Sequence, residues 1–215
     1  MAFVHIPAEQ GSADWHTCRL GRLTGSRAAD MLANPRKGSP ESVSRKRYRT
    51  ELVCERLTGQ SAADTFTSGH LTRGHEQEPD ARGAYEALTG DLVQTSGFLA
   101  HPDLMSGCSL DGHIGDFEGI VEIKCQLPHI HLDVLRSREV PGDYLKQITH
   151  NLWISSAAWA DFISYSPHFP EPLQLFVKRV HRADVDLAAY ELAARLFLAE
   201  VEAEQAEVLA MLEAA

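Results

Sequence analysis

Residues 109–124 have the sequence Ser-Leu-Asp-Gly-His-Ile-Gly-Asp-Phe-Glu-Gly-Ile-Val-Glu-Ile-Lys, and this stretch decides the expected fold. It predicts two short extended runs joined by a glycine-containing turn, with Asp111 at the end of the first run. The second run, Gly119–Cys125, is rich in β-branched residues and carries Glu122 and Lys124 two positions apart. Because alternate residues of a strand share a face, Glu122 and Lys124 project together, and a hairpin can bring Asp111 beside them.

This trio suggests a particular chemistry. Two carboxylates and an ammonium group at a sheet edge can hold Mg²⁺ and orient a water for attack on a phosphodiester. The stretch therefore points to a metal-dependent nuclease. The same Glu-x-Lys pattern is also typical of a solvated strand face, where the pair forms only a weak ion pair.

The composition is that of an ordinary soluble globular protein. The chain has 215 residues, of which 44% are hydrophobic and 23% charged, so we expect one nuclease domain over residues 1–215. No apolar run approaches the roughly 20 residues needed to span a bilayer. Because the first residues lack a basic region followed by an apolar core, we expect a cytoplasmic location with no membrane partner.

The four cysteines, Cys18, Cys54, Cys108 and Cys125, show neither a CxxC pair nor zinc-site spacing. We expect them to be small buried residues in a reducing compartment. None follows position 125, which counts against a nuclease whose iron–sulfur cluster is held near the C-terminus.

The net charge of −10 is unevenly distributed. Residues 183–215 carry eight acids and one arginine, so the rest of the chain has a net charge of only −3. Residues 36–49 hold six basic side chains and one acid. Such a segment is either a patch that binds a phosphate backbone or a solvated helix face, and both interpretations stand.

The order of predicted elements favours an α/β fold of mixed α+β type, with a central mixed β-sheet flanked by helices and a long C-terminal helix. Asp184 can cap that last helix. Glu204 interrupts its apolar seam, which favours packing on the domain over a long coiled coil, although a subunit contact stays open. The expected helices are a short one capped by Ser26, then Ser42–Leu57, Gly69–Thr89, Tyr144–Ser155 and Asp184–Leu212; the expected strands are Leu92–Thr95, Met105–Asp111, Gly119–Cys125, Ala160–Tyr165 and Leu173–Val180.

A two-metal site needs acids beyond the hairpin. The helix Gly69–Thr89 can supply one from the other side of the site, and by charge alone any of its acids would serve, Glu76 and Glu78 among them. Pro79 directly follows Glu78 and alters the helix locally, so the choice between the two acids stays open.

An ordered set of motifs along most of the chain resembles the lambda exonuclease, or YqaJ-like, family of phage recombination nucleases, within the restriction-endonuclease-like fold. The motifs are Asp14-Trp15-His16, Arg19 to Ser26, Gly74-x3-Glu78-x-Asp-Ala-Arg82, Cys108-Ser-x-Asp-Gly112, Glu122-x-Lys-Cys125, Tyr144-x2-Gln147-x5-Trp153 and Tyr165-x-Pro167.

The resemblance implies a site with two Mg²⁺ ions, for which Mn²⁺ can substitute. Asp111, Glu122 and the backbone carbonyl of Ile123 would be metal ligands, and Glu78 would complete the second metal site. Lys124 would hold and activate the attacking water, and Gln147 would help to orient it.

The resemblance also implies a pocket for the terminal 5′-phosphate, formed by Arg19, Ser26 and Ser109. An arginine suits this role because its planar fork binds phosphate bidentately. Arg36 falls where the family places a basic loop against the DNA.

The implied activity is a 5′→3′ exonuclease that degrades one strand of linear duplex DNA from 5′-phosphorylated ends and leaves 3′ single-stranded overhangs. The resemblance further implies a phage or prophage protein in a bacterial host, a ring-shaped homotrimer and a single-strand annealing protein as partner. Two alternatives stay open: a restriction-like, structure-specific endonuclease, and a non-catalytic DNA-end-binding recombination accessory protein.

Overall fold

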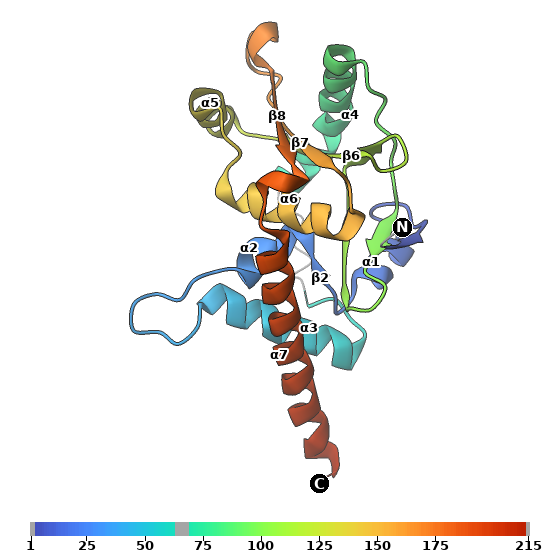
Figure 1. Ribbon diagram of the computed structural model, residues 1–215, viewed down its shortest axis with the longest axis vertical. Helices are drawn as coiled ribbons and strands as arrows, with labels where there is room; N and C mark the ends of the chain where they lie inside the picture. Colours follow the sequence, from blue (N-terminus) through green and yellow to red (C-terminus); the bar gives the residue numbers. More distant parts are fainter. Residues whose placement is uncertain (1–2, 63–68, 214–215) are drawn as a thin grey trace.

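The computed structural model describes residues 3–62 and 69–213 (Figure 1). Its helices are α1 (Ala13–Arg19), α2 (Ala28–Met31), α3 (Val43–Thr58), α4 (Gly69–Thr89), α5 (Pro128–Ser137), α6 (Gly142–Ser155) and α7 (Leu187–Glu213). Its strands are β1 (Val4–Ile6), β2 (Leu23–Thr24), β3 (Phe98–Ala100), β4 (Ser106–Ser109), β5 (Gly112–Ile114), β6 (Gly119–Cys125), β7 (Trp159–Tyr165) and β8 (Leu175–His181).

The strands form two mixed sheets, ordered β1-β3-β4-β2 and β5-β6-β7-β8, where the sequence predicted a single central sheet. The chain leaves the first sheet after Ser109 and enters the second at Gly112. The predicted strand Met105–Asp111 therefore ends early, and Asp111 lies in the connection between the sheets. The mixed α+β class with a long C-terminal helix is confirmed.

The centre of the second sheet is the parallel pair β6–β7, flanked by antiparallel β5 and β8. Ile120 belongs to the main hydrophobic core. Val121 and Ile123 face a second cluster that contains Ala81 and Tyr85 of α4. The even-numbered residues of β6 therefore face one side of the sheet and the odd-numbered residues face α4.

Most of the long predicted elements are confirmed, including α4, α6, β6 and β7. Helix α3 ends at Gly59, whose φ of 66° is the left-handed C-cap conformation. Strand β8 begins two residues later than predicted, because a 3₁₀ turn occupies Glu171–Leu173. The short strands β1, β2, β3 and β5 were not predicted, since segments of two or three residues carry little periodicity, and α5 was missed as well.

Three local predictions were wrong. Residues 92–95 form no strand, only an isolated bridge from Gln94 to His113. Ser26 lies inside a 3₁₀ turn, Gly25–Arg27, and makes no side-chain cap to α2. Asp184 accepts the backbone N–H of His181, whereas Asp186 accepts that of Ala189 and caps the first turn of α7.

The cysteine prediction is only partly correct. All four cysteines are free thiols; Cys108 is buried, but Cys54 is exposed on α3. None of the described helices is both long and apolar enough to cross a membrane.

Helix α7 packs across α3, and its C-terminal turns extend beyond the rest of the protein (Figure 1). The interruption of its apolar seam by Glu204 has a direct cause, because Oε2 of this residue accepts a hydrogen bond of 2.8 Å from Nε of Arg49 on α3. Packing on the domain, the favoured prediction for this helix, is confirmed.

Candidate active site

The β5–β6 hairpin brings Asp111 beside Glu122. Gly112 pairs with Val121 in the antiparallel ladder, so Asp111, one residue earlier, lies level with Glu122. Asp111 directly precedes β5, and its side chain makes the hydrogen bond to β6 at this level. Its Oδ2 accepts the backbone N–H of Ile123 at 2.7 Å. The predicted convergence of these two acids is present in the structure.

Glu122 and Lys124 share the face of β6 that α6 covers. Glu122 is only 1% exposed, and its Oε1 lies 2.5 Å from Nζ of Lys124. Burial raises the pKa of Glu122; Lys124 lowers it, Asp111 and Glu78 raise it, and the result is about 7. Burial lowers the pKa of Lys124, but Glu122 and Asp111 raise it more, so this ammonium group stays protonated.

Helix α6 forms the cover of this face. The ring of Tyr144 lies 5.3 Å from Nζ of Lys124 and stacks on Phe162 of β7 at 5.6 Å. Gln147 follows on the same helix and is partly buried. One turn later, Nδ2 of Asn151 donates a hydrogen bond of 2.9 Å to Oε2 of Glu122.

Asn151 was missed by the sequence analysis. A signal was available, because residues four apart on a helix share a face and Gln147 was already assigned to the site.

Helix α4 supplies the next acid from the other side of β6. Nη2 of Arg82 donates to Oε1 of Glu78 at 2.8 Å and to the backbone carbonyl of Asp111 at 3.3 Å. Glu78 is therefore linked to Asp111, and its charge acts on the pKa of Glu122. Glu76 is exposed. Of the two acids left open by the sequence, the geometry favours Glu78.

The donor set suits a hard divalent cation. In the described part of the chain, no three His, Cys, Asp or Glu side chains form a ready-made metal cage. The carboxyl groups of Asp111, Glu122 and Glu78 nevertheless lie near one another, with Lys124 paired to Glu122 and Arg82 paired to Glu78. Carboxylate and carbonyl oxygens are the ligands that Mg²⁺ prefers, so these residues fit the metal.

A second polar site lies at the end of β4, two residues before Asp111. Oγ of Ser109 accepts hydrogen bonds from Nε1 of Trp15 at 2.8 Å and from Nη1 of Arg19 at 2.9 Å. The Arg19 guanidinium also lies 4.2 Å from the centroid of the Trp15 ring, and burial lowers its pKa. The structure thus brings Arg19 and Ser109 together, with Trp15 as an additional residue that sequence reasoning gave no role.

Ser26 is exposed on the neighbouring 3₁₀ turn. No contact places its side chain against Arg19 or Ser109, so its assignment to the phosphate pocket remains a prediction.

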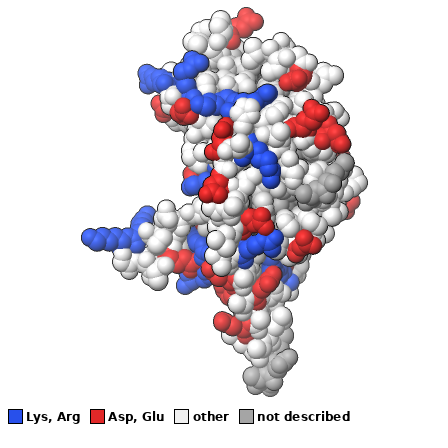
Figure 2. All heavy atoms as spheres, viewed as in Figure 1, with Lys and Arg blue, Asp and Glu red and all other residues white. Residues whose placement is uncertain are grey.

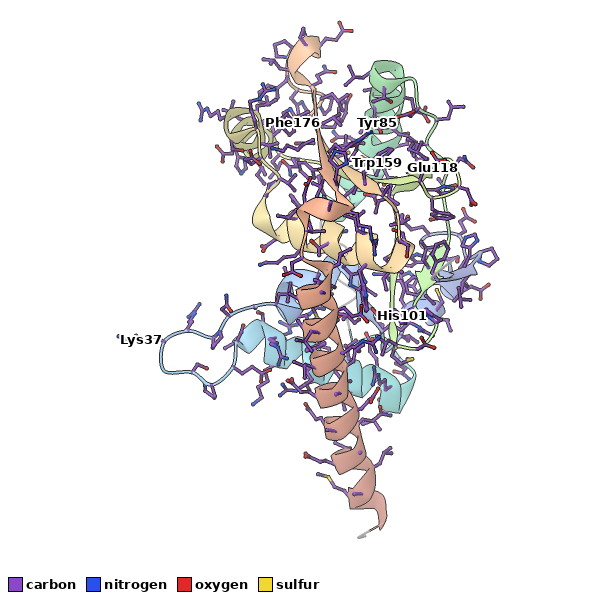
Figure 3. All side chains as sticks on the ribbon, viewed as in Figure 1. Lys37, Tyr85, His101, Glu118, Trp159 and Phe176 are labelled. Carbon is purple, nitrogen blue, oxygen red and sulfur yellow. The ribbon has the colours of Figure 1, made fainter. Side chains whose placement is uncertain are left out.

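The basic segment 36–49 divides into two parts. Arg45 and Arg49 form ion pairs with Glu41 and Glu200, and Arg47 pairs with Glu51. Arg36 and Lys37 are exposed on the loop before α3, and Lys37 points away from the body at its tip (Figure 3).

Figure 2 shows acidic and basic side chains interspersed on the visible face. Acids from α3, α7 and the preceding loop pair with the three arginines in the helical part of residues 36–49, whereas Lys46 stays exposed.

The mixed sheet, with an aspartate, a glutamate and a lysine converging beside a covering helix, defines a nuclease-like α+β fold. The chain belongs to the YqaJ-like viral recombinase domain family, whose family model matches residues 14–158.

Solved structures agree with this assignment. The alkaline exonuclease LHK-Exo from Laribacter hongkongensis is 33% identical, with 94% of this chain and 98% of that chain covered and a TM-score of 0.84. Its complex with dAMP is also 33% identical, covers 95% of this chain and 100% of that chain, and has a TM-score of 0.85. A phage-related exonuclease from Haemophilus somnus 129PT is 10% identical over 89% of this chain and 96% of that chain; its TM-score of 0.65 shows the shared fold. No curated protein matches the sequence.

Proposed function

We propose that this protein is a metal-dependent 5′→3′ exonuclease that degrades one strand of linear duplex DNA from 5′-phosphorylated ends. The observation that carries the proposal is the convergence of Asp111, Glu122 and Lys124 at β6. Membership of the viral recombinase family and similarity to an alkaline exonuclease support it.

The metal ligands of the proposal are Asp111, Glu122 and the carbonyl of Ile123, with Glu78 completing a second Mg²⁺ or Mn²⁺ site. When bound, the metal ions lower the pKa of the attacking water and stabilise the leaving oxygen. Because Asp111 is held by the N–H of Ile123 and Glu122 by Asn151, both carboxylates are fixed in position before the substrate arrives.

Lys124 acts as a cation rather than as a proton acceptor. The two neighbouring acids raise its pKa, so the ammonium group keeps its proton at neutral pH. A protonated lysine can donate hydrogen bonds to the attacking water and to a phosphate oxygen. Gln147 on α6 would help to orient the same water.

The polarity of the reaction follows from the neighbouring polar site. Arg19, supported by Ser109 and Trp15, is suited to bind a terminal 5′-phosphate, with Ser26 as a further contact and Arg36 against the DNA backbone. Ser109 is two residues from Asp111, so a phosphate held there would lie beside the carboxylates. After each cleavage the new 5′-phosphate can enter the same pocket.

The biological setting in the proposal is phage-type recombination in the bacterial cytoplasm. The 3′ overhang would be handed to a single-strand annealing protein, and a homotrimeric ring around the DNA would provide processivity. Family membership supports this setting.

The test is digestion of a linear duplex that carries a 5′-phosphate at one end only, with a separate internal label on each strand, in Mg²⁺ or EDTA. We expect Mg²⁺-dependent loss of the 5′-phosphorylated strand alone, starting at that end. Cuts in a closed circular duplex would instead indicate an endonuclease. Binding of DNA ends without cleavage in any divalent metal would indicate an accessory protein.

A further inference from the structure

Asn151 lies buried between the two parts of the proposed site. Its side chain is 1% exposed and donates from Nδ2 to Oε2 of Glu122 at 2.9 Å. The other carboxylate oxygen, Oε1, faces Lys124 at 2.5 Å. These two contacts fix the rotation of the Glu122 carboxylate, which has one oxygen on the amide and the other toward Lys124.

The other side of the Asn151 amide faces the turn Gly25–Arg27. A Cβ added to Gly25 would lie 2.4 Å from Oδ1 of Asn151, well inside contact distance. The φ of Gly25 is not in the left-handed region, so the close approach of Asn151, rather than backbone conformation, is what excludes a larger residue. The turn that carries Ser26 is thus packed directly against the residue that holds Glu122.

The orientation of Asn151 depends on its neighbour in the chain. His150 is fully buried; its Nε2 lies 2.9 Å from the carbonyl of Gly107 on β4, and its Nδ1 lies 2.8 Å from the hydroxyl of Tyr190 on α7. These contacts fix the rotation of α6 about its axis. The next side chain, Asn151, is thereby directed at β6.

The Asn151 amide is satisfied on its donor side only. Oδ1 of Asn151 is buried and has no hydrogen-bond partner among the described residues. An unsatisfied buried polar group costs about 1–3 kcal/mol, and an apolar side chain of the same volume would avoid that cost. The donor function toward Glu122 is what an apolar side chain could not supply.

We infer that Asn151 is a positioning residue, which holds the Glu122 carboxylate in the orientation that binds the catalytic metal and couples it to the Gly25–Arg27 turn. This inference rests on the proposed function, because it assigns Glu122 as a metal ligand. Residues that orient a metal ligand typically change metal affinity or activity by about 10–100-fold when replaced.

Two substitutions disturb this contact by different routes. Asn151→Leu removes the donor while keeping the number and branching of the side-chain heavy atoms. Gly25→Ala leaves Asn151 in place but pushes its amide away from the turn with one methyl group. Gly142→Ala, at the start of the same α6 helix, is the matched control, because a Cβ there meets nothing within 4 Å.

The experiment is a calorimetric titration of each variant of the full chain with Mn²⁺ alone, without DNA, followed by kcat and KM for duplex DNA at saturating Mn²⁺. We expect Asn151→Leu and Gly25→Ala to weaken Mn²⁺ binding by about 10–100-fold and to lower kcat with little change in KM. Gly142→Ala should match the unmodified protein.

A purely structural role would lower the melting temperature and leave the Mn²⁺ affinity of the folded protein unchanged. That result in both variants would overturn the inference and leave the proposed function intact. If the unmodified protein binds no Mn²⁺ and cleaves no DNA, the proposed function and the inference are both wrong.

Discussion

Two clusters of charged side chains, one around β6 and one between α3 and α7, contain similar residues but pair their charges differently. Between α3 and α7, Arg45 and Arg49 meet Glu41 and Glu200 in ion pairs of 2.5–3.2 Å. Around β6, Lys124 contacts Glu122 and Arg82 contacts Glu78, but the carboxylate of Asp111 accepts the backbone N–H of Ile123 and forms no ion pair with a basic side chain of the described residues. The charges of the first cluster are therefore balanced pair by pair, whereas the second leaves one carboxylate without a basic partner, as a cation site requires.

The pKa shifts record this difference. Burial alone would raise the pKa of Glu41, but Arg45 and Arg49 lower it below its ordinary value. Burial raises the pKa of Glu122, and the attraction of Lys124 is opposed by Asp111 and Glu78. Perturbed groups with unbalanced charge are typical of functional sites, whereas balanced networks support the fold.

The same comparison can be made for basic side chains, between Arg45 of the α3–α7 cluster and Arg19 near β6. Glu200 and Glu41 raise the pKa of Arg45, whereas burial lowers the pKa of Arg19, which donates a hydrogen bond to the neutral hydroxyl of Ser109. A half-buried guanidinium on a hydroxyl and an aromatic ring retains its capacity to bind an anion. The β6 region thus combines a site suited to a cation with one suited to an anion.

The largest effect is expected from Asp111→Asn. The amide oxygen can still accept the N–H of Ile123, but a proposed metal ligand and one of the repelling charges are lost. Since residues that only support a metal ligand give about 10–100-fold effects, we expect the cleavage rate to fall by more than 100-fold. The melting temperature of the metal-free protein should stay the same or rise.

Asp116→Asn is the matched control, because Asp116 is an exposed acid in the turn of the same hairpin. Near-normal cleavage by Asp111→Asn would place the metal site elsewhere. A sharp loss of stability would show instead that this carboxylate supports the fold, as the α3–α7 acids do.

A smaller effect is expected from Arg19→Gln. This variant keeps a donor for Ser109 but removes the charge. We expect the ratio of cleavage rates on 5′-phosphorylated and 5′-hydroxyl ends to fall by about 10-fold, the equivalent of one charge-assisted hydrogen bond of roughly 1.5 kcal/mol. An unchanged ratio, measured with matched duplexes, would show that the anion site does not bind the DNA end.

Arg49→Ala tests the balanced cluster. We expect a loss of about 1 kcal/mol in the free energy of unfolding, and a melting temperature lower by about 2–4 °C for a chain of this size. Cleavage per folded molecule should not change. Arg47→Ala, which removes a pair whose arginine is 69% exposed, should have a smaller effect.

The stability difference caused by Arg49→Ala should also depend on pH in a known direction. Because the folded-state pKa of Glu41 is lowered, its ion pairs stabilise the fold above the ordinary carboxyl range and are lost as pH falls through the folded pKa. The gap between unmodified and Arg49→Ala proteins should therefore narrow in acid. A gap that widens in acid would contradict the assignment.

The sequence predicted the β5–β6 hairpin of the candidate site because its signals are local. The two-residue period of β6 places Glu122 and Lys124 on one face, and the glycine turn between β5 and β6 returns Asp111 to them. Helices α3 and α6 were predicted for the same reason, since each has apolar residues at helical spacing, and the ends of α3 and α4 are marked by Gly59 and Gly90, both with positive φ.

The remaining features depend on contacts between distant segments. Besides the nearby Glu41, the acids that pair with Arg45 and Arg49 lie more than 150 residues away on α7, so residues 36–49 retained an apparent excess of basic charge. The contact of Asn151 with Glu122 spans 29 residues and two elements. The division into two sheets also escaped prediction, because β2 and β5 have two and three residues.

The smallest effect is expected from Arg36→Ala, on the part of the basic segment that stays exposed. No acid among the described residues pairs with this side chain in the structure, unlike Arg45 or Arg49 on the helix that follows. If it contacts a DNA phosphate, its loss should reduce the slope of log affinity against log salt by about one, with the cleavage rate at saturating DNA unchanged. Arg195→Ala on α7, which removes a base paired with Glu191, should leave the slope unaltered. If the unmodified protein, Arg36→Ala and Arg195→Ala all have the same slope, the loop is a solvated surface. Of the two proposed DNA-binding arginines, Arg19 and Arg36, only Arg19 would then remain.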